Sequence, residues 1–325
     1  MKKLLTIFLV FSMLLSFTAC FRRRTDAVDA DADAPMVFLC AGLDEAAENT
    51  DVLFLLSLDP SAERISVMQI PRDTYFRADT AVDKINGVYA ASRCRGESAE
   101  RALSLLSSLV SETFSVSLSG SVAFTAAALR AAVDAMGGVA VTLPSDIELE
   151  GTRYTAGTHL LSGKEAESFV RYREGYVMGD LGRVDAQKIF LSAFLRRART
   201  HLRPAALIQM LFSMREDLIT DIPIARALSL GLWAHAHLSS LSAVFFTLPG
   251  EPLLYNGHWY YIANRESSIR LLSEYFPFGG GFDGAHRLYK EGELAQENIY
   301  SDKNFPYLVY TEEDLSSLEI QTKKE

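Results

Sequence analysis

The pattern of apolar and polar positions predicts both strands and helices. Short, nearly continuous apolar runs rich in Val, Ile, Leu and Phe predict strands that are covered on both faces. Such runs are "MVFLCAG" (36–42), "DVLFLLSLD" (51–59) and "RISVMQI" (64–70), with further strands predicted at 137–144 and 242–250 and a hairpin over 251–263. Apolar positions spaced three or four apart predict helices over 97–112, 121–136, 162–170, 180–202, 204–217, 222–237 and 264–275.

Helices and strands intermix along the chain, which predicts one α/β domain with helices on both sides of a mixed sheet. This domain is expected to span residues 36–278. Beyond it, "GGGFDG" predicts a loose connection, and residues 279–325 are expected to form a C-terminal extension that packs on the periphery. The spacing of Ser162 and Glu165 is that of a capping box and predicts where one helix begins.

The N-terminal residues have the pattern of a bacterial signal peptide. Two lysines precede an apolar run over residues 4–17, which is too short to span a bilayer comfortably. The following "FTAC" resembles a lipobox, so residues 1–20 are interpreted as a lipoprotein signal peptide and Cys20 as an acylated membrane anchor. Ordinary cleavage or an uncleaved anchor are the alternatives, and each of them places the rest of the chain outside the cytoplasm. The lipid anchor would hold it at the outer face of the cell membrane. Residues 21–35 predict a flexible tether.

Charge argues against nucleic acid as a partner. The 325 residues carry a formal net charge of −9, which becomes −11 once residues 1–19 are removed, because that segment holds two lysines and no acid. A chain this acidic lacks the excess of Lys and Arg that binding to a nucleic-acid phosphate backbone requires. Cys40 and Cys94 could pair outside the cell or remain thiols, and the sequence leaves both possibilities open.

Three arginines follow apolar elements in this acidic chain. Arg72 continues the apolar face of a strand just where Pro71 ends it. In "FVRYRE" (169–174), an extended alternation would set Arg171 and Arg173 on one side of the backbone.

A fourth arginine is expected on the face of a helix that points toward the core, which forms a stripe of side chains along the helix. From residue 180 onward, steps of 100° bring Arg183 and Gln187 into line with Phe190 and Phe194. Two polar side chains would therefore lie on a core-facing stripe. A cation in such a position is costly unless an anion meets it.

Two interpretations account for these arginines. They could form internal salt bridges with nearby acids, which are Asp44, Asp51, Asp73, Glu174 and Asp180. Alternatively, four guanidinium groups from three segments could share a polyanionic ligand, because each binds phosphate through two parallel hydrogen bonds.

Two carboxylates and one lysine extend the second interpretation. Asp44 follows one strand and Asp51 begins the next, and carboxylates beside bound phosphates suit Mg²⁺ or Mn²⁺. Loop capping is the alternative role for these two residues. Lys84 in "DKING" is either a lysine at a helix end or a further phosphate contact.

Seven segments in order then give a resemblance to a known family. They are "AGLDE…ENTDVLFLLSLDP", "ISVMQIPRDTYF", "DKINGVYA", "AMGGVAVTLP", "HLLSGKEAESFVRYRE", "GDLGRVDAQKIFLSAFL" and "FTLPGE". Over roughly residues 36–276 the chain is similar to the LytR-CpsA-Psr (LCP) family. The resemblance implies an α-β-α sandwich with a mixed central sheet. It also implies a phosphotransferase that moves an anionic, teichoic-acid- or capsule-like glycopolymer from a polyprenyl-pyrophosphate carrier onto peptidoglycan.

Roles for particular residues follow from the same resemblance. The implied pyrophosphate contacts are Arg72, Lys84, Arg171, Arg173, Arg183 and Gln187, and Mg²⁺ would lie near Asp44 and Asp51. Arg72, Arg171, Arg173 and Asp51 are the expected catalytic residues. Many members have Arg where this chain has Asn49 and Ala186, and the first departure would weaken phosphate binding.

The carrier's long apolar tail needs cover, because each buried CH₂ contributes about 0.8 kcal/mol. An apolar pocket is therefore expected to open at the arginines. Its candidate walls are Phe124, Ala128, Ala132, Phe190 and Phe194. Two alternative functions remain open on the sequence: a hydrolase that uses water as the acceptor at the same site, and a non-catalytic lipoprotein that binds polyprenyl phosphate or acts as a scaffold.

Overall fold

A computed structural model describes residues 34–78, 83–201, 210–211, 213–255, 257–277, 285–288 and 307–323. The predicted signal peptide, Cys20 and nearly all of the tether lie outside the described residues. So does half of the helix predicted over 204–217. In the part of the chain that is described, no helix combines the length and the apolar composition needed to cross a bilayer.

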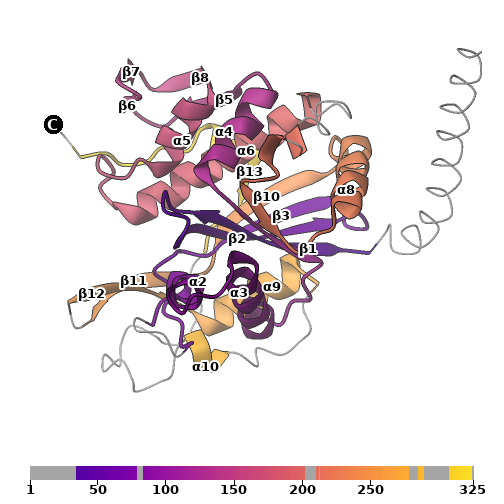
Figure 1. The fold of residues 1–325 in the computed structure, drawn as a ribbon. Helices are drawn as coiled ribbons and strands as arrows, with labels where there is room; N and C mark the ends of the chain where they lie inside the picture. The colour runs from indigo at the N-terminus through magenta and orange to yellow at the C-terminus, as the bar shows by residue number, and fades with distance from the viewer. Residues whose placement is uncertain are drawn as a thin grey trace, which may run out of the picture.

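A mixed central sheet of seven strands runs through the described part of the molecule (Figure 1). The strand order is β13-β10-β3-β2-β1-β4-β9, and β1 pairs antiparallel with β2 but parallel with β4. The strands are β1 (Met36–Leu43), β2 (Thr50–Asp59), β3 (Arg64–Gln69), β4 (Gly120–Phe124), β9 (Leu218–Thr220), β10 (Ser242–Thr247) and β13 (Tyr310–Thr311). The predicted α/β fold with a mixed sheet is confirmed.

Alternate residues of β1 point into two separate apolar cores. Val37 and Leu39 belong to the core on one face of the sheet, whereas Phe38 and Cys40 belong to the core on the other. Both faces are covered, so every position of the strand after Met36 is buried in an apolar environment. This explains why the sequence there is a continuous apolar run and not an alternating one.

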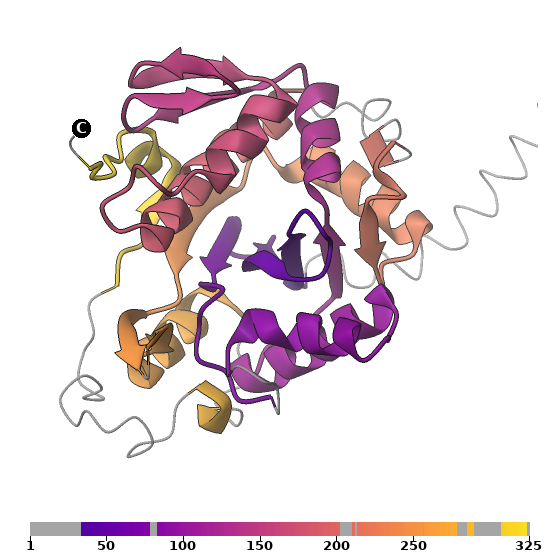
Figure 2. The ribbon, with the colours of Figure 1, turned by 60° about the vertical axis from the view of Figure 1, so that its left-hand side comes forward.

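Helices form a layer on each face of the sheet. In Figure 2 the indigo strands lie between the purple helices α2 and α3 and the pink helices α5 and α6. The first layer comprises α2 (Ile85–Cys94), α3 (Ala99–Phe114), α9 (Arg265–Tyr275) and α10 (Ala285–Leu288). The second comprises α4 (Ala126–Ala135), α5 (Gly163–Arg171), α6 (Asp180–His201), α8 (Ile224–His237) and α11 (Glu312–Ser316). The predicted capping box at Ser162 and Glu165 begins α5.

Three small two-stranded sheets complete the fold. They are β5 (Val139–Leu143) with β8 (Gly157–Leu161), β6 (Ile147–Leu149) with β7 (Thr152–Tyr154), and β11 (Gly250–Tyr255) with β12 (His258–Ala263). The last pair is the hairpin predicted over 251–263, although Asn256 in its turn lies outside the described residues.

The helix predicted over 121–136 is wrong in its first part. Gly120–Phe124 form strand β4, which is paired on one side with β1 and on the other with β9. The apolar residues of this short segment fit a helical spacing equally well, but the backbone hydrogen bonds to two neighbouring strands decide the conformation. Helix α4 begins only after Thr125, whose hydroxyl accepts a hydrogen bond from the Ala128 N–H.

The expectation of peripheral packing for the C-terminal extension does not hold for its residues 307–323. β13 pairs with β10 at one edge of the central sheet, and Leu315 and Ile320 are buried in the core beside α6. The sequence gives little sign of this, because the segment is short and mostly polar and its partners lie far away along the chain.

The two cysteines of the described region are not bonded to each other. Cys40 is buried and Cys94 is exposed, and burial raises the pKa of the Cys40 thiol to about 12. We expect a thiol reagent to modify Cys94 in the folded protein and Cys40 only after unfolding, since the thiolate is the reactive form. Mass spectrometry of labelled peptides with and without denaturant measures this, and rapid labelling of Cys40 in the folded protein would contradict the packing described.

Candidate functional site

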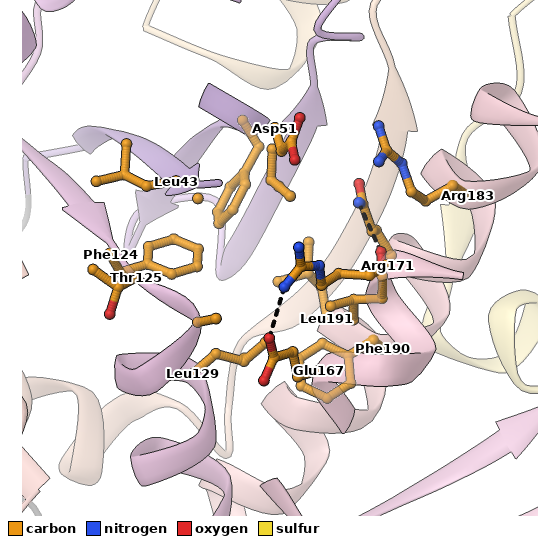
Figure 3. Close-up of a pocket in the computed structure, with 16 residues that line it drawn as sticks. Leu43, Asp51, Phe124, Thr125, Leu129, Glu167, Arg171, Arg183, Phe190 and Leu191 are labelled. Carbon is orange, nitrogen blue, oxygen red and sulfur yellow. Dashed lines mark hydrogen bonds and ion pairs between the residues drawn. The ribbon is translucent and has the colours of Figure 1, made fainter. Parts of the chain in front are cut away.

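An apolar cavity of about 90 Å³ opens at one end of the sheet, between the strands and the helices α4, α5 and α6 (Figure 3). Its apolar wall includes Val52, Phe54, Phe124, Leu129 and Phe190. Charged and polar side chains also line it: Asp51 from β2, Glu167 and Arg171 from α5, and Arg183 and Gln187 from α6. The cavity therefore combines an apolar interior with ionised groups of both signs.

Two arginines and two aspartates form a network beside this cavity. Arg72 Nη1 donates a hydrogen bond of 2.6 Å to Asp51 Oδ1, and Arg72 Nη2 lies 3.4 Å from Asp180 Oδ1. Arg183 Nη2 lies 2.6 Å from the same Asp180 oxygen. One carboxylate thus holds two guanidinium groups together, which like charge alone would drive apart.

Burial acts on both arginines of this network. It would lower the pKa of Arg72, but the charges of Asp180 and Asp51 outweigh it and raise that pKa. Burial lowers the pKa of Arg183, which is only 5% exposed, and the nearby Arg72 charge lowers it further, while Asp180 opposes both effects. Arginine nevertheless remains protonated in proteins, so both groups act as fixed cations.

Part of the hydrogen-bonding capacity of these arginines is unused. The Nε groups of Arg72 and Arg183 are buried and have no hydrogen-bond partner within the described residues. A buried donor without a partner costs about 1–3 kcal/mol. An anion that reached both groups would satisfy them and would relieve the repulsion between the two cations.

Gln187 connects three elements behind the network. Its Nε2 donates to the Val170 carbonyl at the end of α5 (3.1 Å), and its Oε1 accepts from Gln69 Nε2 of β3 (3.2 Å). The predicted stripe of α6 is confirmed for Arg183, Gln187 and Phe190, which all line the cavity. Phe194 is half-buried, stacks at 5.9 Å from Phe190 and is not among the lining residues.

Arg171 and Arg173 lie at the C-terminal end of α5. The extended alternation predicted there is wrong for Arg171, which is the last residue of the helix. Arg171 Nη1 donates to Glu167 Oε1 (2.9 Å), one helical turn earlier, and its side chain is 46% exposed. Arg173 is exposed and forms no ion pair with any residue the structure describes. Both border a second, polar groove that includes Glu150 and Glu174.

Lys84 stands apart from the cavity. Its Nζ donates to Asp73 Oδ1 (2.7 Å) and lies 5.4 Å from the centre of the Tyr260 ring. The negative charge of Asp73 also helps to raise the pKa of Arg72, its neighbour in sequence. Lys84 is therefore linked to the arginine network through Asp73, although it does not line the cavity.

Asp44 and Asp51 have different surroundings. Asp44 Oδ1 accepts from the backbone N–H groups of Glu48 and Asn49, and its Oδ2 accepts from Asn49 Nδ2 (2.7 Å). Burial would raise the pKa of Asp44, but these hydrogen bonds and the Arg171 charge lower it. This arrangement is that of a loop cap, and Asn49, one of the two departures expected from the sequence, takes part in it. The other departure, Ala186, is fully buried in the core.

Asp51 is the better candidate for a metal ligand. It lines the cavity, and its second carboxylate oxygen accepts no hydrogen bond from the described residues. No group of three or more His, Cys, Asp or Glu side chains is positioned to hold a metal there or elsewhere in the described part of the chain. A single carboxylate beside arginines still fits Mg²⁺, which takes much of its coordination from substrate phosphates and water.

Several residues that build the site were not predicted. Leu129 lines the cavity, whereas Ala128 and Ala132, the expected wall positions on the same helix, are buried elsewhere. Glu167 orients Arg171 and also pairs with Arg130. The only sequence signal for Glu167 is its spacing of four residues from Arg171, which places the two on one side of a helix.

The sequence profile described as the LytR_cpsA_psr family matches residues 18–274. The chain belongs to this family. Over 240 residues it is 28% identical to the polyisoprenyl-teichoic acid–peptidoglycan teichoic acid transferase TagU of Oceanobacillus iheyensis, covering 73% of each chain.

Solved structures agree with this assignment at the level of the fold. The crystal structure of Bacillus subtilis TagV superposes with a TM-score of 0.61 at 22% identity, covering 76% of this chain and 98% of TagV. The structure of TagT bound to LI-WTA gives a TM-score of 0.61 at 23% identity, covering 74% and 89% of the two chains. The LytR-CpsA-Psr domain therefore accounts for most of the protein.

Proposed function

We propose that this protein transfers an anionic, teichoic-acid-like glycopolymer from a polyprenyl-pyrophosphate carrier to peptidoglycan. Family membership and the teichoic acid transferase activity named for its relative TagU support this function. The observation that carries it is the pair formed by the partly buried Arg72 and the buried Arg183 beside an apolar cavity. Such a site suits a ligand that is doubly charged at one end and hydrocarbon at the other.

The pyrophosphate would take the position between the two arginines. Its oxygens would accept from the unused Nε groups of Arg72 and Arg183 and would compete with Asp51 and Asp180 for the remaining guanidinium donors. Arg171 and Arg173, at the rim, would contact the phosphate that bears the glycan. The internal ion pairs and the ligand-binding role are then compatible, because the aspartates hold the arginines in place until the ligand arrives.

The apolar cavity would receive the carrier carbons closest to the pyrophosphate. Phe124, Leu129 and Phe190 would remove them from water. This leaves the charged end of the carrier at the cavity mouth, where the acceptor can reach it.

The reaction itself is a displacement at phosphorus. The 6-hydroxyl oxygen of a muramic acid residue would form a bond to the phosphorus that bears the glycan, and the bond from this phosphorus to the bridging oxygen would break. The polyprenyl phosphate would leave with the electron pair, and the hydroxyl proton would be lost to solvent. Fixed cations at Arg72 and Arg183 would stabilise the charge that shifts to the leaving phosphate.

The carboxylates near the arginines would have supporting roles. Asp180 and Asp73 are both held in ion pairs, with Arg183 and Lys84 respectively, which suits them to orient cations. Asp51 would hold Mg²⁺ or Mn²⁺ together with phosphate oxygens. When bound, the metal would add further positive charge against the transferred phosphoryl group.

The proposed place of action is the outer face of the cell membrane, with Cys20 as the lipid anchor. Cys20→Ser is expected to leave unprocessed precursor and to abolish labelling with a fatty-acid analogue, since the acylated thiol would be missing. Metabolic labelling followed by electrophoresis measures this. Undiminished labelling of the variant would place the lipid elsewhere.

Dependence on the acceptor tests the proposed activity. The purified protein is incubated with a synthetic polyprenyl-pyrophosphate glycan and Mg²⁺, with or without peptidoglycan oligomers, and released polyprenyl phosphate is measured. We expect release only when the oligomers are present. Release at the same rate without them would indicate a hydrolase, and no release in either case would indicate a binding protein.

A further inference from the structure

The C-terminal segment, residues 307–323, lies beyond the part of the chain that the family profile matches, yet it packs beside the candidate site. In Figure 2 its yellow trace runs next to the pink α5 and α6. β13 extends the central sheet through pairs between Phe245 and Tyr310 and between Val244 and Thr311. The segment is thus an integral part of the fold.

Several contacts anchor this segment to α6. Glu312 forms an ion pair with Arg199 in which both side chains are less than one fifth exposed, and its carbonyl accepts from Arg196 Nη1 (3.2 Å). Leu315 and Ile320 are buried in the core that also holds Tyr176. These anchors hold the segment independently of its last few residues.

Those last residues pair with the loop that joins α5 to α6. Thr322 lies opposite Tyr176 in an antiparallel bridge. The N–H of Val177 donates to the Gln321 carbonyl (2.9 Å), and the N–H of Lys323 donates to the Gly175 carbonyl (2.8 Å). Two hydrogen bonds therefore fix the backbone of the loop on either side of Tyr176.

The loop between α5 and α6 is closely packed around two glycines and two tyrosines. At Gly175 a Cβ atom would lie 2.0 Å from the Tyr172 hydroxyl, and at Gly182 it would lie 2.6 Å from the Tyr176 Cβ. The Tyr172 and Tyr176 rings meet edge to face at 5.2 Å. Close packing of these four residues gives the loop one compact conformation, and the C-terminal segment covers its backbone.

We infer that residues 321–323 are a positioning element for the pyrophosphate site, a role that rests on the function proposed above. The loop over 172–179 carries Arg173, begins directly after Arg171 and ends directly before Asp180, the residue shared by Arg72 and Arg183. Fixing this loop therefore sets the separation between the arginines at the end of α5 and those held by Asp180. Without the two hydrogen bonds, the loop would sample other conformations and the arginines would no longer converge on one phosphate group.

Two variants of the full chain in detergent test this inference. The first ends at Ile320 and loses both hydrogen bonds to the loop, while it keeps Leu315 and Ile320 in the core. The second is Lys323→Pro, which removes one N–H donor and leaves the chain length unchanged. The matched control ends at Lys323, so it loses only two residues and keeps both hydrogen bonds.

The measurements are hydrogen exchange of the loop, binding of geranylgeranyl pyrophosphate, and the melting temperature. For the chain ending at Ile320 we expect faster exchange over 172–179 with unchanged exchange in α6, and binding weaker by about tenfold, because small displacements at a binding site have large effects. Lys323→Pro should show the same change to a smaller degree, and the control should match the wild type.

The outcomes separate this inference from the proposed function. Unchanged exchange and unchanged binding in the chain ending at Ile320 would overturn the positioning role. A fall in melting temperature with faster exchange throughout α6 in both variants would also overturn it, because residues 321–323 would then support the whole layer. Wild-type protein that does not bind the probe would contradict the proposed function instead, while the exchange result would still report on the loop.

Discussion

Replacing Arg72 with alanine is expected to reduce glycopolymer transfer by about 10³-fold, the lower end of the effect of removing an arginine that stabilises phosphoryl transfer. Arg72 supplies one of the two guanidinium groups of the network, contacts both Asp51 and Asp180, and has an unused Nε donor. Its loss would remove positive charge where charge develops on the leaving phosphate. Initial rates with the polyprenyl-pyrophosphate donor measure the effect.

Folding of this variant needs a separate measurement, because the substitution leaves Asp51 without its partner. Both partners are about one quarter exposed, so we expect a stability cost of only about 1–2 kcal/mol, between the values for surface and buried pairs. Arg64→Ala, on β3 and outside the site, is the matched control and should retain full activity. An Arg72→Ala protein that melts near the wild-type temperature and still transfers at the wild-type rate would refute the role of Arg72.

Leu129→Trp is expected to prevent turnover of long-chain donors while sparing a short-chain pyrophosphate analogue. Leu129 lines the apolar cavity (Figure 3), and a larger side chain there would fill space that the proximal carrier carbons would occupy. The loss would reach about 10²-fold if some four buried CH₂ groups of the carrier were displaced, at about 0.8 kcal/mol each. Rates for the two donor lengths, compared in the same assay, give the result.

The control for this substitution lies on the same helix. Ala135 is exposed at the end of α4, so Ala135→Trp should affect neither donor. Equal loss of both activities in Leu129→Trp would mean that the cavity supports the arginines and does not hold the carrier tail. Equal retention would mean that the tail stays outside the protein.

Much of the fold could be predicted from apolar spacing, because both faces of the sheet are buried. The run that forms β1 has no polar side chain, and within the apolar runs of β2 and β3 only Ser57 and Ser66 are polar, which is the pattern that strands between two helical layers require. β4 escapes prediction because it is only five residues long and is separated from the Ala-rich α4 by Thr125 alone. Only the hydrogen bonds to β1 and β9 distinguish it from a further helical turn.

The part of the candidate site whose residues all lie on one helix could be predicted from the sequence. Arg183, Gln187 and Phe190 lie on α6, so the 100° step along a helix was enough to bring them together. The sharing of Asp180 by Arg72 and Arg183 joins the turn after β3 to α6, and its geometry depends on how the layers pack. The same holds for the pairing of Gly175 and Val177 with residues 321–323, which join distant parts of the chain.

Mass spectrometry of the acceptor tests the central proposal most directly. The purified protein is incubated with a synthetic polyprenyl-pyrophosphate glycan, peptidoglycan oligomers and Mg²⁺, and the oligomers are then analysed. We predict oligomers that have gained the mass of the glycan phosphate, linked through a phosphodiester at the muramic acid 6-position, together with one polyprenyl phosphate for each product. Free glycan phosphate with unmodified oligomers, or a donor recovered intact, would contradict the proposed transferase.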